Sequence, residues 1–152
     1  MIELIQSPDE KEAITRSVLT ALPEWFEIPE NVEKYIRESR DRLFLAAKID
    51  GQPVGFLCLQ ETGKDTVELH VMGILKAYHR QGVGRALVEK AKELAAEEGY
   101  SFLQVKTVQY GKYAEYDQTN LFYRSCGFKE FEVFPELWDE NNPCQIYVMS
   151  LK

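Results

Sequence analysis

Two glycines one residue apart stand in the segment Tyr78–Leu87, which reads YHRQGVGRAL. An apolar run ends near Leu75 and helical spacing begins near Gly82, so the glycines lie where a strand gives way to a helix. The first turn of a helix has unpaired N–H groups and a partial positive charge, and glycine lets an anion approach the backbone. Arg80 and Arg85 could neutralise further charge. The segment therefore predicts an anion-binding turn, with a plain tight corner as the alternative.

Two common nucleotide-binding patterns do not fit this segment. The dinucleotide fingerprint requires a third glycine at the position of Leu87, and the P-loop requires a Gly-Lys pair followed by Ser or Thr. A protein that uses the same turn to bind ATP is therefore the weaker alternative.

Glu68 and His70 carry further titratable groups in the segment VELHVMGI, which leads to the turn. The two-residue period of a strand places them on one face with Met72 and Ile74, unless a bulge intervenes. A carboxylate and an imidazole on an otherwise apolar face are candidates for proton transfer. The alternative is a solvated charge at the strand edge for Glu68 and a core histidine with satisfied hydrogen bonds for His70.

Hydrophobic periodicity predicts the elements that must position these groups. Ser7 and Pro8 form the start of a capped helix, and Asp50-Gly51 predicts a hairpin turn. Strands are expected over 1–6, on both sides of that turn within 42–62, and over 66–75, 100–109, 128–134 and 145–151. Helices are expected over 7–22, 31–40, 82–98 and 115–127.

This element order predicts an α/β (α+β) fold with a single domain over residues 1–152. Three consecutive strands joined by hairpins, followed by a strand–helix–strand unit, require a mixed sheet with helices on its faces. We expect a mostly antiparallel sheet of about seven strands and about four helices. A doubly wound parallel sheet is disfavoured because it needs a helix between successive strands.

The composition argues against several classes of protein. The 152 residues are 45% hydrophobic and 28% charged, and the net charge of −7 lacks the basic footprint of a nucleic-acid-binding protein. No signal peptide and no apolar stretch of about 20 residues is present, so we expect a cytoplasmic protein without a membrane or nucleic-acid partner. Three scattered cysteines and two histidines predict neither a disulfide framework nor a metal site.

Residues His79–Gly84, HRQGVG, resemble the acetyl-CoA-binding motif of the GCN5-related N-acetyltransferase (GNAT) superfamily. That motif reads Arg or Gln, two residues, Gly, one residue, then Gly or Ala. His79 takes the first position here, and a frame shifted to Gln81 fits the pattern but moves the glycines from their usual place. Leu121–Phe128, LFYRSCGF, is similar to a late-helix motif of the family, and the element order matches over nearly the whole chain. The chain resembles uncharacterised bacterial-type members.

The resemblance implies acetyl-CoA (coenzyme A) as the cofactor and a sheet that splays between its fourth and fifth strands. The pantetheine arm would enter this gap and pair with the backbone of Met72, Gly73 and Ile74. Asn120 is a weaker candidate for a cofactor contact, because Tyr116 stands where many members have asparagine. The diphosphate would lie against the turn formed by His79, Arg80, Gln81, Gly82, Val83, Gly84 and Arg85.

The resemblance also implies candidates for proton transfer. Glu68 is the preferred base for an amine substrate, and His70 could act instead or relay the proton through water. Tyr123 matches the tyrosine that many members direct at the cofactor sulfur, so it is the candidate acid; the alternative is an aromatic packed with Phe122 and Phe128. An acyl-enzyme on Cys126 is disfavoured because no histidine matches it. Direct transfer in a ternary complex is therefore expected.

The acceptor groove of the family lies at the first two helices and the loop between the last two strands. Trp25, Phe26, Tyr35 and Trp138 would form its aromatic walls, and nearby acidic residues would favour a small cation. The alternative is that both tryptophans pack on the core. We expect an N-acetyltransferase acting on a primary amine of a small molecule or peptide. The alternative is a catalytically weak acyl-CoA-binding sensor or interaction module, and homodimerisation stays open.

Overall fold

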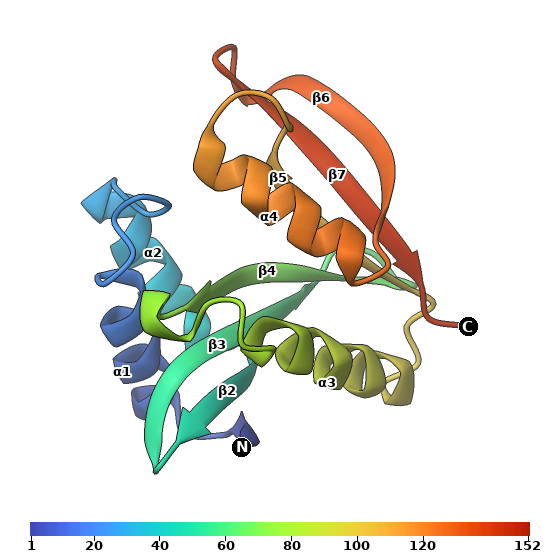
Figure 1. Ribbon diagram of the computed structural model, residues 1–152. Helices are drawn as coiled ribbons and strands as arrows, with labels where there is room; N and C mark the ends of the chain where they lie inside the picture. The colour runs from blue at the N-terminus through green and yellow to red at the C-terminus, as the bar shows by residue number, and fades with distance from the viewer. The chain divides into compact units, whose positions relative to one another are not determined.

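The computed structural model describes residues 1–152 and contains four α-helices, one short 3-10 helix and seven strands (Figure 1). The elements are β1 (Ile2–Ile5), α1 (Pro8–Leu19), α2 (Pro29–Ser39), β2 (Leu43–Ile49), β3 (Gln52–Glu61), β4 (Thr66–Ile74), η1 (Lys76–Tyr78), α3 (Val83–Glu97), β5 (Phe102–Val108), α4 (Ala114–Ser125), β6 (Lys129–Asp139) and β7 (Asn142–Ser150).

The strands form one sheet in the order β1-β2-β3-β4-β5-β7-β6. Only the β4–β5 pair is described as parallel, and the other described pairs are antiparallel. The predicted mixed, mostly antiparallel sheet with four helices is therefore confirmed. The chain divides into two compact units, residues 1–60 with 70–94 and residues 61–69 with 95–152, and β4 contributes to both. The single domain stays a prediction.

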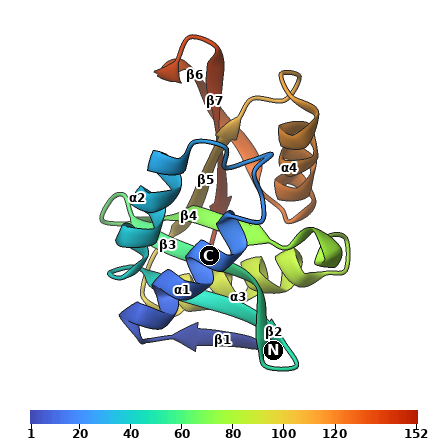
Figure 2. The same cartoon turned by 90° about the vertical axis from the view of Figure 1, so that its left-hand side faces the viewer.

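The first unit has a core between its sheet and the helices α1 and α2. Phe44 on β2 stacks on Phe56 on β3 at 5.2 Å between ring centroids, and both belong to the core formed with these helices. Leu45 and Leu57, which follow Phe44 and Phe56 in the sequence, are also buried. Alternation along a strand places them on the opposite face of the sheet. Figures 1 and 2 show α1 and α2 on one side of these strands and α3 on the other.

The predicted start of α1 is confirmed. The Ser7 hydroxyl oxygen accepts a hydrogen bond from the backbone N–H of Glu10 at 3.2 Å, and Pro8 is the first helical residue. The hairpin turn is also confirmed, because Asp50 and Gly51 both have positive φ, 52° and 79°. These two local signals fix where the chain enters α1 and how β2 turns into β3.

The second unit is built on β5, which pairs with strands on both sides. The described parallel ladder joins Thr66–Leu69 to Phe102–Val105, and an antiparallel ladder joins β5 to β7. Helix α4 packs on this sheet through the aromatic rings of Tyr123 and Tyr147, 6.2 Å apart. The expected splay between β4 and β5 stays a prediction.

The hairpin β6–β7 is longer than the sequence predicts. Residues 135–144 were expected to separate two short strands, but β6 continues through Pro135 to Asp139 and β7 begins at Asn142. Proline cannot donate to a strand ladder, but β6 is an edge strand and tolerates it. The Asp139 carboxylate accepts from the Asn141 N–H at 2.8 Å and closes a tight turn.

None of the helices is both long and apolar enough to cross a membrane.

Candidate active site

The predicted anion-binding turn connects η1 to α3 through a backbone of unusual conformation. Arg80 has φ +61°, rare for a residue with a side chain, and Gly82 has φ +83°. A Cβ atom added to Gly82 would meet no other atom within 4 Å, so the space beside this backbone is open. The N–H of Ala86 donates to the Gly82 carbonyl at 3.0 Å and begins the helical bonding. The preceding N–H of Val83 therefore has no acceptor within the helix.

His79 takes part in this turn through a hydrogen bond and an aromatic contact. Its Nε2 lies 2.6 Å from the carbonyl oxygen of Ile74. Because a carbonyl can only accept, Nε2 carries the proton in this hydrogen bond. The ring also meets Trp25 edge-on, with centroids 5.8 Å apart and an interplanar angle of 73°. His79 therefore ties the end of β4 to the segment between α1 and α2.

The end of β4 is pressed against α1. A Cβ atom on Gly73 would lie 3.0 Å from the Val18 side chain and 3.3 Å from those of Leu19 and Leu22. Gly73 therefore admits the close approach of helix and strand. Met72 and Ile74 are half-buried.

Two consecutive residues of β4, His70 and Val71, both have contacts toward α2. His70 contacts α2 through Tyr35, and its neighbour Val71 belongs to the core under α1 and α2. A two-residue period places consecutive side chains on opposite faces unless a bulge intervenes, so the shared face of Glu68, His70, Met72 and Ile74 stays a prediction.

Glu68 is buried, with 6% of its surface exposed, and has two partners on β5. Gln104 Nε2 lies 2.9 Å from Glu68 Oε1, and Lys106 Nζ lies 3.0 Å from the same oxygen. The alternative of a solvated charge at a strand edge is therefore wrong. Both of these contacts fall on Oε1, and they hold the carboxylate in one orientation.

His70 is paired with a carboxylate that the sequence analysis missed. Its Nε2 lies 3.3 Å from Glu38 Oε1, and its ring meets Tyr35 edge-on at 5.8 Å. Tyr35 and Glu38 stand three residues apart on α2, so they share one face of the helix. The three-residue spacing of Tyr35 and Glu38 could have indicated a shared helix face. Only the structure shows that this face contacts His70 on β4.

Tyr123 is buried in an aromatic cluster on α4. Its ring lies 5.6 Å from Phe122, 5.6 Å from Phe128 and 6.2 Å from Tyr147. Burial raises the pKa of the Tyr123 hydroxyl well above its ordinary value, so the group keeps its proton at neutral pH. The packing with Phe122 and Phe128, which was the alternative to a role as acid, is present. The same side chain also carries a protonated hydroxyl.

Asn120 is fully buried and its side chain is occupied by protein groups. Its amide nitrogen donates to the Val108 carbonyl at 2.8 Å and to the Tyr116 carbonyl at 2.6 Å. The Tyr147 hydroxyl donates to Asn120 Oδ1 at 2.6 Å and accepts from Arg124 Nε at 3.1 Å. These bonds tie α4 to β5 and β7, and they account for both amide hydrogens of Asn120.

The aromatic residues expected around the acceptor differ in burial. Trp25, Phe26 and Tyr35 are half-buried and pack against the core of the first unit, and Phe26 meets Tyr35 edge-on at 6.1 Å. Trp138 on β6 is 47% exposed. The alternative expectation was that both tryptophans pack on the core. Trp25 does so in part, whereas about half of the Trp138 surface is exposed to solvent.

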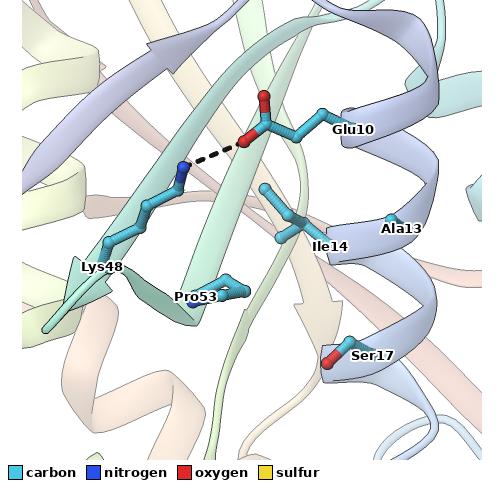
Figure 3. Close-up of a pocket in the computed structure, with 7 residues that line it drawn as sticks. Glu10, Ala13, Ile14, Ser17, Lys48 and Pro53 are labelled. Carbon is cyan, nitrogen blue, oxygen red and sulfur yellow. Dashed lines mark hydrogen bonds and ion pairs between the residues drawn. The ribbon is translucent and has the colours of Figure 1, made fainter.

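A pocket of about 340 Å³ opens elsewhere in the first unit, between α1 and the β2–β3 turn (Figure 3). Its charged groups neutralise each other, because Lys48 Nζ lies 2.9 Å from Glu10 Oε2. No residue predicted for the site lines this pocket. Its lining consists of Glu10, Ala13, Ile14, Ser17, Lys48, Gly51 and Pro53.

Comparison with known proteins decides the family. Residues 10–128, well over half of the chain, match the acetyltransferase (GNAT) family. The chain belongs to this family. An uncharacterised N-acetyltransferase of Chlorobaculum tepidum is 29% identical to this acetyltransferase over 135 residues, which cover 87% of this chain and 79% of the relative.

Solved structures of other acetyltransferases share the fold of this acetyltransferase. One is an acetyltransferase assigned to the GNAT family from Desulfovibrio desulfuricans, with a TM-score of 0.86 and 20% identity over 100% of this chain and 99% of the other. Another is an aminoglycoside 6'-N-acetyltransferase complexed with coenzyme A, with a TM-score of 0.79 and 17% identity over 100% and 97% of the two chains. The expected acetyltransferase fold is therefore confirmed.

Acetyl-CoA is the acyl donor of this acetyltransferase, and the turn between η1 and α3 fits its diphosphate. The open space beside Gly82 admits an anion to the backbone, and the first turn of α3 supplies N–H groups and a partial positive charge. Left-handed backbone at Arg80 and Gly82 is typical of concave anion sites made by main-chain N–H groups. The exposed side chains of Arg80 and Arg85 add positive charge.

Proposed function

We propose that this acetyltransferase transfers the acetyl group of acetyl-CoA to a primary amine of a small molecule or peptide by direct attack in a ternary complex. The buried Glu68 carboxylate, oriented by Gln104 and Lys106, is the observation that carries the proposal. A carboxylate held in a single orientation inside the protein is suited to accept a proton from a positioned amine.

The proton transfers are assigned to three side chains. Glu68 accepts the proton that the amine nitrogen loses as it bonds to the acyl carbon, either directly or through water held by His70. Bound acetyl-CoA supplies an acyl carbon whose bond to sulfur breaks, leaving a thiolate. The Tyr123 hydroxyl donates its proton or a hydrogen bond to that sulfur, and its raised pKa keeps the hydroxyl protonated at neutral pH.

The cofactor contacts are assigned to the end of β4 and the turn that follows it. The backbone of Met72 and Gly73 extends alongside the pantetheine arm, while the Ile74 carbonyl is engaged by His79. The diphosphate lies at the backbone between Arg80 and Arg85. We assign Asn120 to structural support of α4, because its amide hydrogens already have acceptors.

The acceptor is assigned as a small cationic amine. Trp25, Phe26, Tyr35 and Trp138 provide aromatic surface, which attracts cations. The net charge of −7 favours the approach of a cation. The structurally similar aminoglycoside 6'-N-acetyltransferase is consistent with a polyamine-like acceptor.

A screen of primary amines with acetyl-CoA tests this function, read as release of coenzyme A. With an accepted amine, we expect Glu68→Gln and Tyr123→Phe each to lower kcat by about 100- to 10,000-fold, the usual contribution of a general base or acid. Coenzyme A affinity should stay within about threefold in calorimetry, a difference of less than one kcal/mol.

Two outcomes would contradict the proposal in different ways. Coenzyme A binding without turnover of any amine would favour an acyl-CoA sensor. Turnover that survives both substitutions would retain the activity but remove the assigned base and acid.

A further inference from the structure

His79 occupies the junction between the cofactor turn and the segment that joins α1 to α2. It donates from Nε2 to the Ile74 carbonyl at 2.6 Å, and its ring meets the indole of Trp25 at 5.8 Å. Both His79 and Trp25 are half-buried, so the contact lies within the packed part of the first unit. His79 thereby contacts both Ile74, at the strand end assigned to the pantetheine arm, and Trp25, an aromatic residue assigned to the acceptor site.

A second contact joins the same two segments. Lys76 of η1 forms an ion pair with Glu24, the residue before Trp25, and this pair lowers the pKa of the Glu24 carboxyl. Both side chains are exposed, and exposed ion pairs contribute little to stability. The half-buried contact between His79 and Trp25 is therefore the stronger of the two links between these segments.

We propose that His79 is a positioning residue that couples acetyl-CoA binding to acceptor selection. Its hydrogen bond fixes the Ile74 carbonyl, and its ring fixes Trp25. The inference rests on the proposed function in one respect, that Trp25 lines the acceptor site. It explains the histidine at the first position of HRQGVG, where the family pattern has Arg or Gln.

Two substitutions at His79 separate its two contacts. His79→Gln retains an N–H that can donate to the Ile74 carbonyl but has no aromatic edge for Trp25. His79→Phe retains an aromatic edge but has no donor. The Trp25 contact is an edge-to-face pair and the Ile74 contact is a hydrogen bond, so each loss corresponds to a change of about three- to tenfold in a binding constant.

Steady-state kinetics with an accepted amine should show a crossed pattern. We expect His79→Gln to raise the KM for the amine about three- to tenfold and to leave the KM for acetyl-CoA within about twofold. His79→Phe should raise the KM for acetyl-CoA by a similar factor and leave the KM for the amine nearly unchanged. A merely structural role would shift both constants together in both variants, and that result would overturn the proposal.

A binding measurement tests the coupling without turnover. The chain has two tryptophans, so Trp138→Phe makes Trp25 the only indole fluorophore. In this background we expect coenzyme A to change the Trp25 emission. Adding His79→Gln should abolish the change while calorimetry still detects coenzyme A binding. Lys90→Gln, an exposed substitution on α3, is the matched control and should preserve the signal.

The outcomes separate this inference from the proposed function. If no amine is acetylated but His79→Gln abolishes the Trp25 response, the coupling stands and the acceptor assignment fails. If amines are acetylated and the Trp25 response to coenzyme A is the same with and without His79→Gln, the coupling is overturned. Thermal unfolding of each variant verifies that the protein compared is folded.

Discussion

Two buried polar side chains in the second unit, Glu68 and Asn120, have partners of different kinds. Glu68 receives contacts from Gln104 and Lys106 on Oε1, and Lys106 brings a positive charge to the carboxylate. Asn120 has acceptors for both amide hydrogens and a donor for its oxygen. Burial of a polar group requires such partners. The complete pairing of the Asn120 amide hydrogens supports its assignment as a structural tie.

The pair Glu68–Lys106 leads to a prediction for stability. Lys106→Met leaves the buried Glu68 carboxylate without its cation, so we expect the free energy of unfolding at neutral pH to fall by about 1–3 kcal/mol. Denaturant titration measures this change. Combining Lys106→Met with Glu68→Gln should cost less than the sum of the two single substitutions, because no unpaired charge is then left buried.

Lys129→Met is the matched control for this prediction. Lys129 is an exposed lysine on β6, and loss of an exposed charge usually changes stability by less than about 0.5 kcal/mol. Equal effects at positions 106 and 129 would show that Glu68 does not depend on Lys106.

Helix α1 and strand β4 approach closely at a glycine. The absence of a side chain at Gly73 lets Val18 and Leu19 of α1, and Leu22 just after it, pack onto the strand before the cofactor turn. A strand end held in this way gives the turn a fixed starting point. The edge strand β6 differs, because almost all of its residues are exposed and Pro135 lies within it.

Gly73→Ala tests this packing. The added methyl group would lie 3.0 Å from the Val18 side chain, so that side chain must move by a few tenths of an ångström. We expect the free energy of unfolding to fall by about 1–3 kcal/mol, the usual cost of overfilling a packed core. Thermal and denaturant unfolding measure it.

Gly63→Ala provides the control for the packing at Gly73. A Cβ atom there meets nothing within 4 Å and the residue has no positive φ, so stability should be unchanged or slightly increased. A neutral Gly73→Ala would mean that α1 accommodates the methyl group without loss.

At the scale of the whole molecule, ligand binding distinguishes the acetyltransferase from an ATP-binding protein. A ligand that binds only the folded chain stabilises it by about 2.7 kcal/mol at 100 times its Kd. We expect coenzyme A to raise Tm and ATP at the same concentration to produce a much smaller shift. Displacement of bound coenzyme A by equimolar ATP would contradict the assignment of the turn to acetyl-CoA.

Local signals in the sequence determined the elements and the chemistry of the turn. The Ser7 cap, the Asp50-Gly51 turn and the strand-to-helix position of Gly82 depend on neighbours only a few residues away, so their conformations follow from residue type. For the same reason, the motifs and the element order were enough to relate the sequence to the acetyltransferase (GNAT) family, which matches residues 10–128.

Only the tertiary structure decided which partners the site residues have. Glu68 meets Lys106, and His70 meets Glu38, across 38 and 32 residues of chain. The passage of β6 through Pro135 likewise depends on the position of this strand at the edge of the sheet. Propensity acts between neighbours in sequence, whereas a side chain's partner depends on how distant elements pack, and no local pattern encodes that.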